Sequence, residues 1–377
     1  MKTLWSFIRR TIILAFFGGV IIVLLILKNS PDVCEAYTRT VARGYGKFVS
    51  SLSSLVSISL TEVAFAILGI SIAFLLVMAV ILLVKRKFFG ALKRIVDGVI
   101  IVVMSIAIYD FSCELAYNRY EMPLPYYTEQ VDSSKFIEIY NAFADDLNYC
   151  CSQIEFKEDG DIIQPLEFKD IINEVKKAYG IVDDPYFHSH FGSVKPMASS
   201  IVYREFQITG VTYSPLGEAN IDILTTHDNL PLTIAHELAH TKGVMREDDA
   251  NKLAFYVCLN SDHYYLRYSA YMWYFYQIRA IVGRPYLKTE EQVGIHSVNQ
   301  NFYKCQSFYS KYWDEHDLLG KIGDFINDLY IKSSGVEEGT SSYGGGTHYD
   351  YDETKEQLIA SPYQQLYFDR YFNKLSV

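Results

Sequence analysis

Two histidines and a glutamate stand close together in the stretch "LTIAHELAH", residues 232–240. In a helix, residues four positions apart share one face, so the rings of His236 and His240 can reach a single cation. Glu237 can then face a water molecule held by that cation. This H-E-x-x-H spacing is typical of zinc hydrolases, in which the metal lowers the pKa of its water towards roughly 7 and the glutamate takes the proton. The alternative is a polar patch on a solvated helix face.

A catalytic zinc ion needs a third protein ligand and one open position. Gly243 can turn the chain, and a second helix is expected to begin near Arg246. Its first turn carries three acids, Glu247, Asp248 and Asp249. Each could complete the site, although the helix dipole favours acids at this position without any metal.

Several other elements are needed to hold these residues in place. The motif helix should begin at about residue 230, with Pro231 in its first turn. Residues 199–224 alternate and are rich in β-branched and aromatic residues, which predicts two or three strands. The low-complexity stretch 333–353 predicts a mobile loop. Further helices are predicted at 133–151, capped by Ser133 or Ser134, at 166–180, closed by Gly180, and at 262–282, whose dense tyrosines indicate a buried position.

Three apolar blocks near the N-terminus, at about 11–27, 63–84 and 95–113, predict three transmembrane helices. Buried core helices are the alternative. The first block follows a basic start but is not followed by a cleavage site, so we expect an uncleaved anchor. The predicted organisation is a membrane region over 1–115 with an external loop over 28–62, a proline-containing linker over 116–131, and a domain over 132–377.

The distribution of charge predicts the orientation and excludes some partners. Three basic residues lie in the first ten positions and five in the loop 85–94, which places the N-terminus and that loop in the cytoplasm. The domain is then extracytoplasmic. From residue 115 onward there are 22 basic and 38 acidic residues, which argues against a nucleic-acid partner and against an anionic membrane surface.

All six cysteines are expected outside the cytoplasm or at its edge, where disulfides can form. Cys34 and Cys113 should lie just beyond the outer ends of the first and third helices, so this is the pair to test first. The alternative is that all six remain thiols.

The motif region resembles zinc metallopeptidases of the gluzincin type. In that group the first glutamate of an E-x-x-A-[DN] signature on the next helix completes the metal site. Here the signature is residues 247–251, "EDDAN". The resemblance implies that Glu247 is the third zinc ligand and that Asn251 orients a ligand histidine.

Most of the chain is similar to a bacterial membrane-protein family known as domain of unknown function 3810. The matching pieces include "AYTRTVARGYGKFVSSLSSL", "NRYEMPLP", "ITGVTYSPLGEANIDI", the motif region, "LRYSAYM" and "INDLYIKSSGVEEGTSSYG". The resemblance implies a zinc metallopeptidase anchored in the bacterial cell membrane, and it implies no particular substrate.

Other residues are candidates for handling a peptide. In zinc peptidases an edge strand beside the motif helix pairs with the substrate backbone. The stretch "GVTYSPLGEANIDI" is expected to take this role, with Gly217, Glu218 and Asn220 near the site. Four residues are candidates for stabilising an oxyanion: Tyr343, His348, Arg267 and Tyr268. His188 and His190 also have metal-like spacing, but a surface role is expected for them.

We therefore predict three N-terminal transmembrane helices and an α+β zincin-like domain that is mostly helical with a small edge sheet. With one catalytic Zn²⁺ and Glu237 as the general base, the enzyme would hydrolyse peptides or envelope proteins outside the cytoplasm. One alternative is a catalytically silent membrane sensor or assembly factor with the same fold. Another is a membrane scaffold without a metal.

Overall fold

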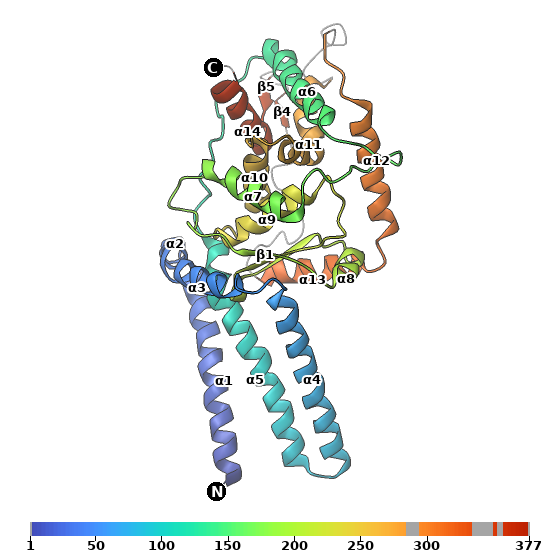
Figure 1. Cartoon of the computed structure of the whole chain (residues 1–377). Coiled ribbons are helices and arrows are strands. Elements are labelled where there is room, and N and C mark those ends of the chain that lie inside the picture. Colours follow the sequence, from blue (N-terminus) through green and yellow to red (C-terminus); the bar gives the residue numbers. More distant parts are fainter. Residues whose placement is uncertain (1, 284–293, 334–349, 353–356, 376–377) are drawn as a thin grey trace.

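Three long helices project from one end of the molecule in the computed structural model, which describes residues 2–283, 294–333, 350–352 and 357–375 (Figure 1). They are α1 (Lys2–Leu27), α4 (Leu60–Val84) and α5 (Phe88–Cys113), and α5 packs against both of the others. By length and composition, two stretches, Trp5–Leu27 and Leu60–Val84, are apolar enough to cross a membrane. The predicted third span is part of α5, a longer helix with charged residues in its first half.

Ion pairs join α1 to α5 near both of their ends. The carboxylate of Asp97, one of two acids that interrupt the third apolar block, lies 2.8 Å from Nε of Arg10. At the other end, Nζ of Lys28 lies 3.0 Å from the Glu114 carboxylate. The acid within α5 is thus matched by a basic residue on α1, which reduces the cost of holding it in an apolar environment.

The segment predicted as an external loop is a helical layer on the globular part. Helix α2 (Pro31–Tyr37) continues through a wider turn over Thr38–Ala42 into α3 (Arg43–Ser53). Its side chains bond the chain around the sheet: the Tyr45 hydroxyl donates to the Pro215 carbonyl at 2.8 Å. In return, Nζ of Lys195 donates to the Ser53 carbonyl at 2.9 Å. The segment predicted as an external loop is therefore packed against the globular part of the chain.

The predicted linker also contributes to this packing, through Arg119. Its guanidinium is buried and donates to the carboxylate of Glu35 at 2.8 Å. It also donates to the carbonyls of Gly243 and Tyr186, both at 2.9 Å. The linker runs extended, as its prolines predict, yet this residue ties α2 to the turn after the motif helix.

A small mixed sheet lies between the projecting helices and the remaining helices (Figure 1). Strand β3 (Glu218–Ile221) is central, with β1 (Ser193–Pro196) parallel on one side and β2 (Gly210–Tyr213) antiparallel on the other. The stretch 199–224 thus contains two strands, as expected, but its first part forms a short helix, α8 (Ser200–Glu205). A separate two-stranded sheet pairs β4 (Asp350–Asp352) with β5 (Gln357–Ile359).

Helices make up most of the globular part. Helix α6 is preceded by a short turn whose cap is Asp132, not Ser133 or Ser134, because the Asp132 carboxylate accepts from the Ser134 amide. Helix α7 ends in a tight turn over Tyr179–Ile181 rather than at Gly180. The helices are α6 (Phe136–Ser152), α7 (Phe168–Ala178), α9 (Leu230–Thr241), α10 (Glu247–Leu259), α11 (Tyr264–Arg279), α12 (Gln300–Glu315), α13 (Gly320–Ser333) and α14 (Pro362–Arg370).

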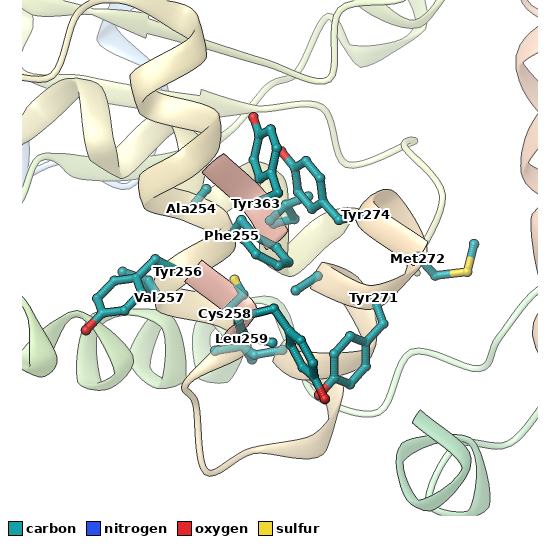
Figure 2. Packing of buried hydrophobic residues seen from close by; sticks show 14 of the residues in the cluster. Ala254, Phe255, Tyr256, Val257, Cys258, Leu259, Tyr271, Met272, Tyr274 and Tyr363 are labelled. Carbon is teal, nitrogen blue, oxygen red and sulfur yellow. The ribbon is translucent and has the colours of Figure 1, made fainter. Parts of the chain in front are cut away.

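Aromatic side chains fill the core between α10, α11 and α14. Figure 2 shows Phe255 from α10 beside Tyr274 and Tyr363, and their ring centroids lie 4.5 and 5.6 Å from the Phe255 ring. The two tyrosine rings stack at 4.2 Å. Helix α11 is buried along most of its length, so the prediction from its dense tyrosines is confirmed. Such rings bury large apolar areas and make the platform against which α9 and α10 pack rigid.

The cysteines form no disulfide. All six are free and buried. Cys34 accordingly packs with Leu24 and Leu115, and Cys113 with Ala116 and Met245. The suggested Cys34–Cys113 bridge is therefore absent, because each thiol lies in its own apolar cluster.

Candidate metal centre

Helix α9 carries the two histidines and is buried on almost every side. Ile234, Ala235 and Leu238 are fully buried, so the helix is held by packing as well as by its own hydrogen bonds. The turn that follows it contains Gly243, whose φ of 84° is one that residues with a side chain rarely adopt. A Cβ added at Gly243 would also come within 2.8 Å of Nε2 of His188. The turn needs glycine on both grounds, and it leads directly into α10.

Three side chains from α9 and α10 converge on one point. Nε2 of His236 lies 3.1 Å from Nε2 of His240 and 3.1 Å from a carboxylate oxygen of Glu247. Nε2 of His240 lies 3.5 Å from the same oxygen. A tetrahedral ion with bonds of about 2.0–2.1 Å separates its ligand atoms by about 3.3 Å. The three atoms therefore stand where three ligands of one small metal ion would stand, and the group can hold one.

The hydrogen bonding of His240 also suits a ligand. Its Nδ1 lies 2.8 Å from the main-chain oxygen of Val244, just past the Gly243 turn. A carbonyl only accepts, so Nδ1 carries the proton and Nε2 keeps its lone pair for the shared point. Main-chain support of this kind fixes both the ring orientation and the tautomer. The turn thus positions Glu247 and prepares His240 at once.

Among the three acids at the start of α10, only Glu247 faces the histidines. Asp248 is paired with Lys252, and Asp249 with Arg246 at 2.6 Å. The choice between the three acids, left open by spacing, is decided by these ion pairs.

The electrostatics of the three groups are coupled. Burial disfavours the charge on His240, but the Glu247 carboxylate outweighs burial and raises the pKa of His240 to about 9. Burial likewise disfavours the charge on Glu247, yet the two histidines lower its pKa well below the ordinary value. A negative carboxylate against two imidazoles draws in a positive charge, either a proton or a metal ion.

Glu237 is held beside this point by the neighbouring strand. It is buried, and the hydroxyl of Thr212 on β2 lies 2.7 Å from its carboxylate. Burial raises the pKa of Glu237, while the charges of His236 and His240 act to lower it. Gly210, also on β2, lies so close that an added Cβ would be 2.6 Å from the Glu237 side chain. A carboxyl group with a raised pKa next to a metal site is suited to accept and return a proton.

The residues predicted to lie near the substrate have other partners in the structure. Glu218 and Asn220 lie on the central strand, and the Glu218 carboxylate accepts from the amide and hydroxyl of Thr61, both at 2.8 Å. Asn220 bonds the Ser59 hydroxyl at 2.6 Å. Gly217 has a φ of 61° and packs against Ser50. Glu218 and Asn220 fix the start of α4 to the sheet, because a carboxylate stabilises free amides at a helix N-terminus.

The other candidates fall in three groups. Tyr343 and His348 lie outside the described residues. Arg267 is bound by Asp146 at 3.0 Å, and Tyr268 is fully buried in the core, so neither is available to an oxyanion. Asn251 is half-buried on α10, and its role in orienting a histidine stays a prediction. His240 is oriented instead by the Val244 carbonyl.

The structure adds three residues to the site that spacing did not indicate: Thr212, Gly210 and Val244. Thr212 and Gly210 stand in the quoted strand stretch, but nothing in their spacing from Glu237 marks them. Val244 contributes only its main-chain oxygen, so its residue type carries no information. Each acts through a long-range or main-chain contact.

Comparison with known proteins identifies a family and no activity. The family described as "Protein of unknown function (DUF3810)" matches residues 37–349, from the last residue of α2 to beyond α13. No curated protein and no solved structure matches the chain.

Proposed function

The chain belongs to the DUF3810 family, whose description names no activity, and we propose from the site that it is a membrane-anchored zinc metallopeptidase acting outside the cytoplasm. The observation that carries the proposal is the arrangement of His236, His240 and Glu247, whose ligand atoms are 3.1–3.5 Å apart. Two imidazoles and one carboxylate suit zinc and leave a fourth position open for water.

The chemistry divides between the metal and Glu237. When bound, zinc would act as a Lewis acid and make water a stronger nucleophile at neutral pH. Glu237 would take a proton from the attacking water and return it to the amine that leaves when the peptide bond breaks. Thr212 would hold the Glu237 carboxylate for both transfers through the contact at 2.7 Å.

The sheet offers a place for an extended peptide. In the sheet formed by the described strands, β2 is at the edge and pairs with β3 alone, and Gly210 on β2 lies against Glu237. A peptide added along this edge would run past the base, with main-chain hydrogen bonds that are independent of its sequence. The stretch predicted for substrate pairing thus supplies the edge through β2, not through Glu218 or Asn220.

The membrane topology is part of the proposal. We place α1, α4 and α5 across the bilayer, with the basic turn Lys85–Lys87 and the N-terminus in the cytoplasm. The pairing of Arg10 with Asp97 at 2.8 Å supports α5 as the third span, since it compensates an acid that would otherwise be costly there. The globular part and the metal centre would then face outward.

The test uses the full chain in lipid nanodiscs, with Glu237→Gln as the informative variant and exposed Glu158→Gln as its matched control. Zinc is measured by elemental analysis, and hydrolysis with a library of quenched peptides. We expect one zinc per chain in all three proteins, hydrolysis by wild type and Glu158→Gln, and a loss of at least about a hundredfold in Glu237→Gln. In native cells, the same variant should leave envelope proteins uncut that wild type shortens.

Three other outcomes would contradict the proposal in different ways. Zinc in every protein with no hydrolysis by wild type would favour the catalytically silent sensor. Absence of zinc from wild type would instead favour a scaffold without a metal. Equal hydrolysis by wild type and Glu237→Gln would contradict the assigned base.

A further inference from the structure

Exposed apolar side chains gather where the three long helices meet the globular part. On α3 and just after it, Phe48 is 62% exposed and Leu55 is 81% exposed, with Leu52 beside them. The opposite side of α3 is occupied: Ser50 and Ser53 are buried against the sheet region. The apolar face of α3 is therefore the one turned away from the domain.

Helix α13 repeats this arrangement. Ile322, Phe325 and Leu329 follow a spacing of three and four residues, which places them on one helical face, and exposed Leu318 lies just before the helix. Phe325 is 69% exposed and Leu329 is 61% exposed. The other side of α13 is in close contact: a Cβ added at Gly323 would lie 2.7 Å from the carbonyl oxygen of Phe206. The stripe is thus an outward face with a packed inner face behind it.

Hydrogen bonds hold these elements at the outer end of α4. The Glu62 carboxylate in the first turn of α4 accepts from the amides of Ala198 and Ser199 at 2.9 and 2.8 Å, which fixes the start of α8. The end of α8 in turn accepts, through the Glu205 carbonyl, from the Leu319 amide at 2.9 Å. Figure 1 shows α3, α8 and α13 at this same level, where the helices leave the globular part.

Single exposed apolar residues are ordinary on a protein surface, but grouped faces mark an interaction site. Helix α8 adds Ile201 and Val202, both exposed. The patch begins where α1, α4 and α5 leave the globular part, and those helices carry exposed apolar side chains along their length. An apolar surface that continues from helices placed in lipid is best covered by the same lipid.

We propose that the exposed apolar faces of α3, α8 and α13 form a membrane-resting surface that lies in the headgroup region of the outer leaflet. The inference rests on the topology of the proposed function, but not on zinc or hydrolysis. Amphipathic helices of this kind lie in the plane of the interface, with their apolar face about 5–10 Å deep.

The membrane-resting surface sets the metal centre close to the membrane. Tyr213, at the end of β2, packs on Phe65 of α4 and Tyr109 of α5, with ring centroids 4.9 and 6.2 Å apart. Gly210, which lies against Glu237, is three residues away, or about 10 Å along a strand. The substrates inferred from this placement are polypeptides that emerge from the same membrane and are cut near its surface.

The experiment measures depth in the full chain, reconstituted in vesicles of phosphatidylcholine and phosphatidylglycerol. Single cysteines at Leu55, Phe325 or Leu329 carry an environment-sensitive fluorophore, and lipids labelled near the headgroup act as quenchers. The native cysteines are buried, so the introduced thiol is the reactive one. Controls are Asp324→Cys on the other side of α13 and Tyr149→Cys on α6, at the far end of the globular part (Figure 1).

We expect about a twofold loss of fluorescence at the three positions on the membrane-resting surface and little loss at the two controls. The same result is expected in the Glu237→Gln background, so a failure of catalysis and a failure of membrane contact are distinguishable. Equal, weak quenching at all five positions would overturn the inference and assign these faces to a protein partner. Ile201→Cys on α8 replaces any of the three surface variants that fails to fold.

Discussion

Two pairs of histidines lie close together in this molecule, and among the residues that the structure describes only one of them belongs to a group that could hold a metal ion. The rings of His236 and His240 are 4.7 Å apart, and those of His188 and His190 are 5.3 Å apart. Both pairs have spacings found among metal ligands. The comparison shows that spacing brings rings together, whereas the partners of the individual nitrogen atoms decide what the rings can do.

The partners differ in kind. In the first pair, one nitrogen of His240 bonds the Val244 carbonyl and the other faces Glu247. In the second pair, both nitrogens of His188 face main-chain oxygens, of Thr241 at 3.2 Å and of Thr38 at 3.1 Å, so neither is left for a metal.

The pKa values of His188 and His240 move in opposite directions because the two rings have different partners. Burial, with a contribution from His190, lowers the pKa of His188 to about 3, although two carbonyl oxygens face its ring. His240 is buried as well, but the carboxylate of Glu247 reverses the effect. His188 is therefore a buried packing residue under the Gly243 turn, and the surface role expected for it is wrong. His240 instead has a nitrogen that could bind a metal ion.

The largest expected effect is a difference in zinc binding between two variants, each of which lacks one ring of one pair. His240→Ala should abolish stoichiometric zinc binding, because two ligands remain where three are needed. His188→Ala should retain zinc while it lowers stability, because it removes only a buried packing contact. Elemental analysis and isothermal titration with zinc measure the difference; loss of zinc in both variants would mean that the pairs act as one site.

A second change separates Glu247 from its neighbours on α10. Glu247→Gln should weaken zinc binding by more than about a hundredfold, because even residues that only support a ligand account for 10- to 100-fold. The control Asp248→Asn, which alters an acid paired with Lys252, should leave affinity within about threefold. Competition with a chromogenic chelator gives both constants. Equal weakening would show that the total negative charge of the turn, not one ligand, attracts the metal.

A third change leaves the metal ligands intact and disturbs the base. Gly210→Ala places a methyl group within 2.6 Å of the Glu237 side chain and should lower kcat by about a hundredfold with zinc content unchanged. Gly44→Ala, where nothing lies within 4 Å of the added Cβ, is the control and should have no effect on kcat. A normal kcat in Gly210→Ala would remove β2 from the mechanism.

The smallest expected effect concerns the pH dependence of stability. The folded pKa of His188 is about 3, below its ordinary value of about 6.5. The unfolded chain therefore binds the proton more tightly. This contribution to stability is complete above about pH 6.5 and falls towards pH 3, by about 2 kcal/mol at pH 5.

The measurement compares unfolding by urea in micelles, at about pH 7 and about pH 5, for wild type and His188→Gln. The variant should lose about 2 kcal/mol less than wild type over this interval. If both lose the same amount, His188 does not carry the difference.

Local patterns predicted much of the site. The four-residue spacing, Pro231 and Gly243 predicted the motif helix, which spans Leu230–Thr241. The start of the second helix near Arg246 was likewise predicted, and with it the approach of Glu247. Helix periodicity and turn residues are short-range properties, so these residues follow from sequence.

Contacts between distant segments could not be predicted in the same way. Glu218 was expected near the substrate, but it bonds Thr61, 157 positions earlier. Nothing in an alternating stretch shows which of its strands will be central, since that depends on the strand that adds beside it. For the same reason Thr212 was not recognised as the partner of Glu237.

The sequence by itself determined the apolar helices, the acidic character of the chain after residue 115, and the presence of two histidines and a glutamate on one helix. Only the tertiary structure decided which strand lies against Glu237, and that α3, α8 and α13 present their apolar faces together. It also brought Glu247, the acid that the resemblance implied, to the two histidines. The reason is physical: hydrogen bonds within a helix depend on neighbours three or four residues away, whereas a metal centre and a surface depend on how separate helices pack.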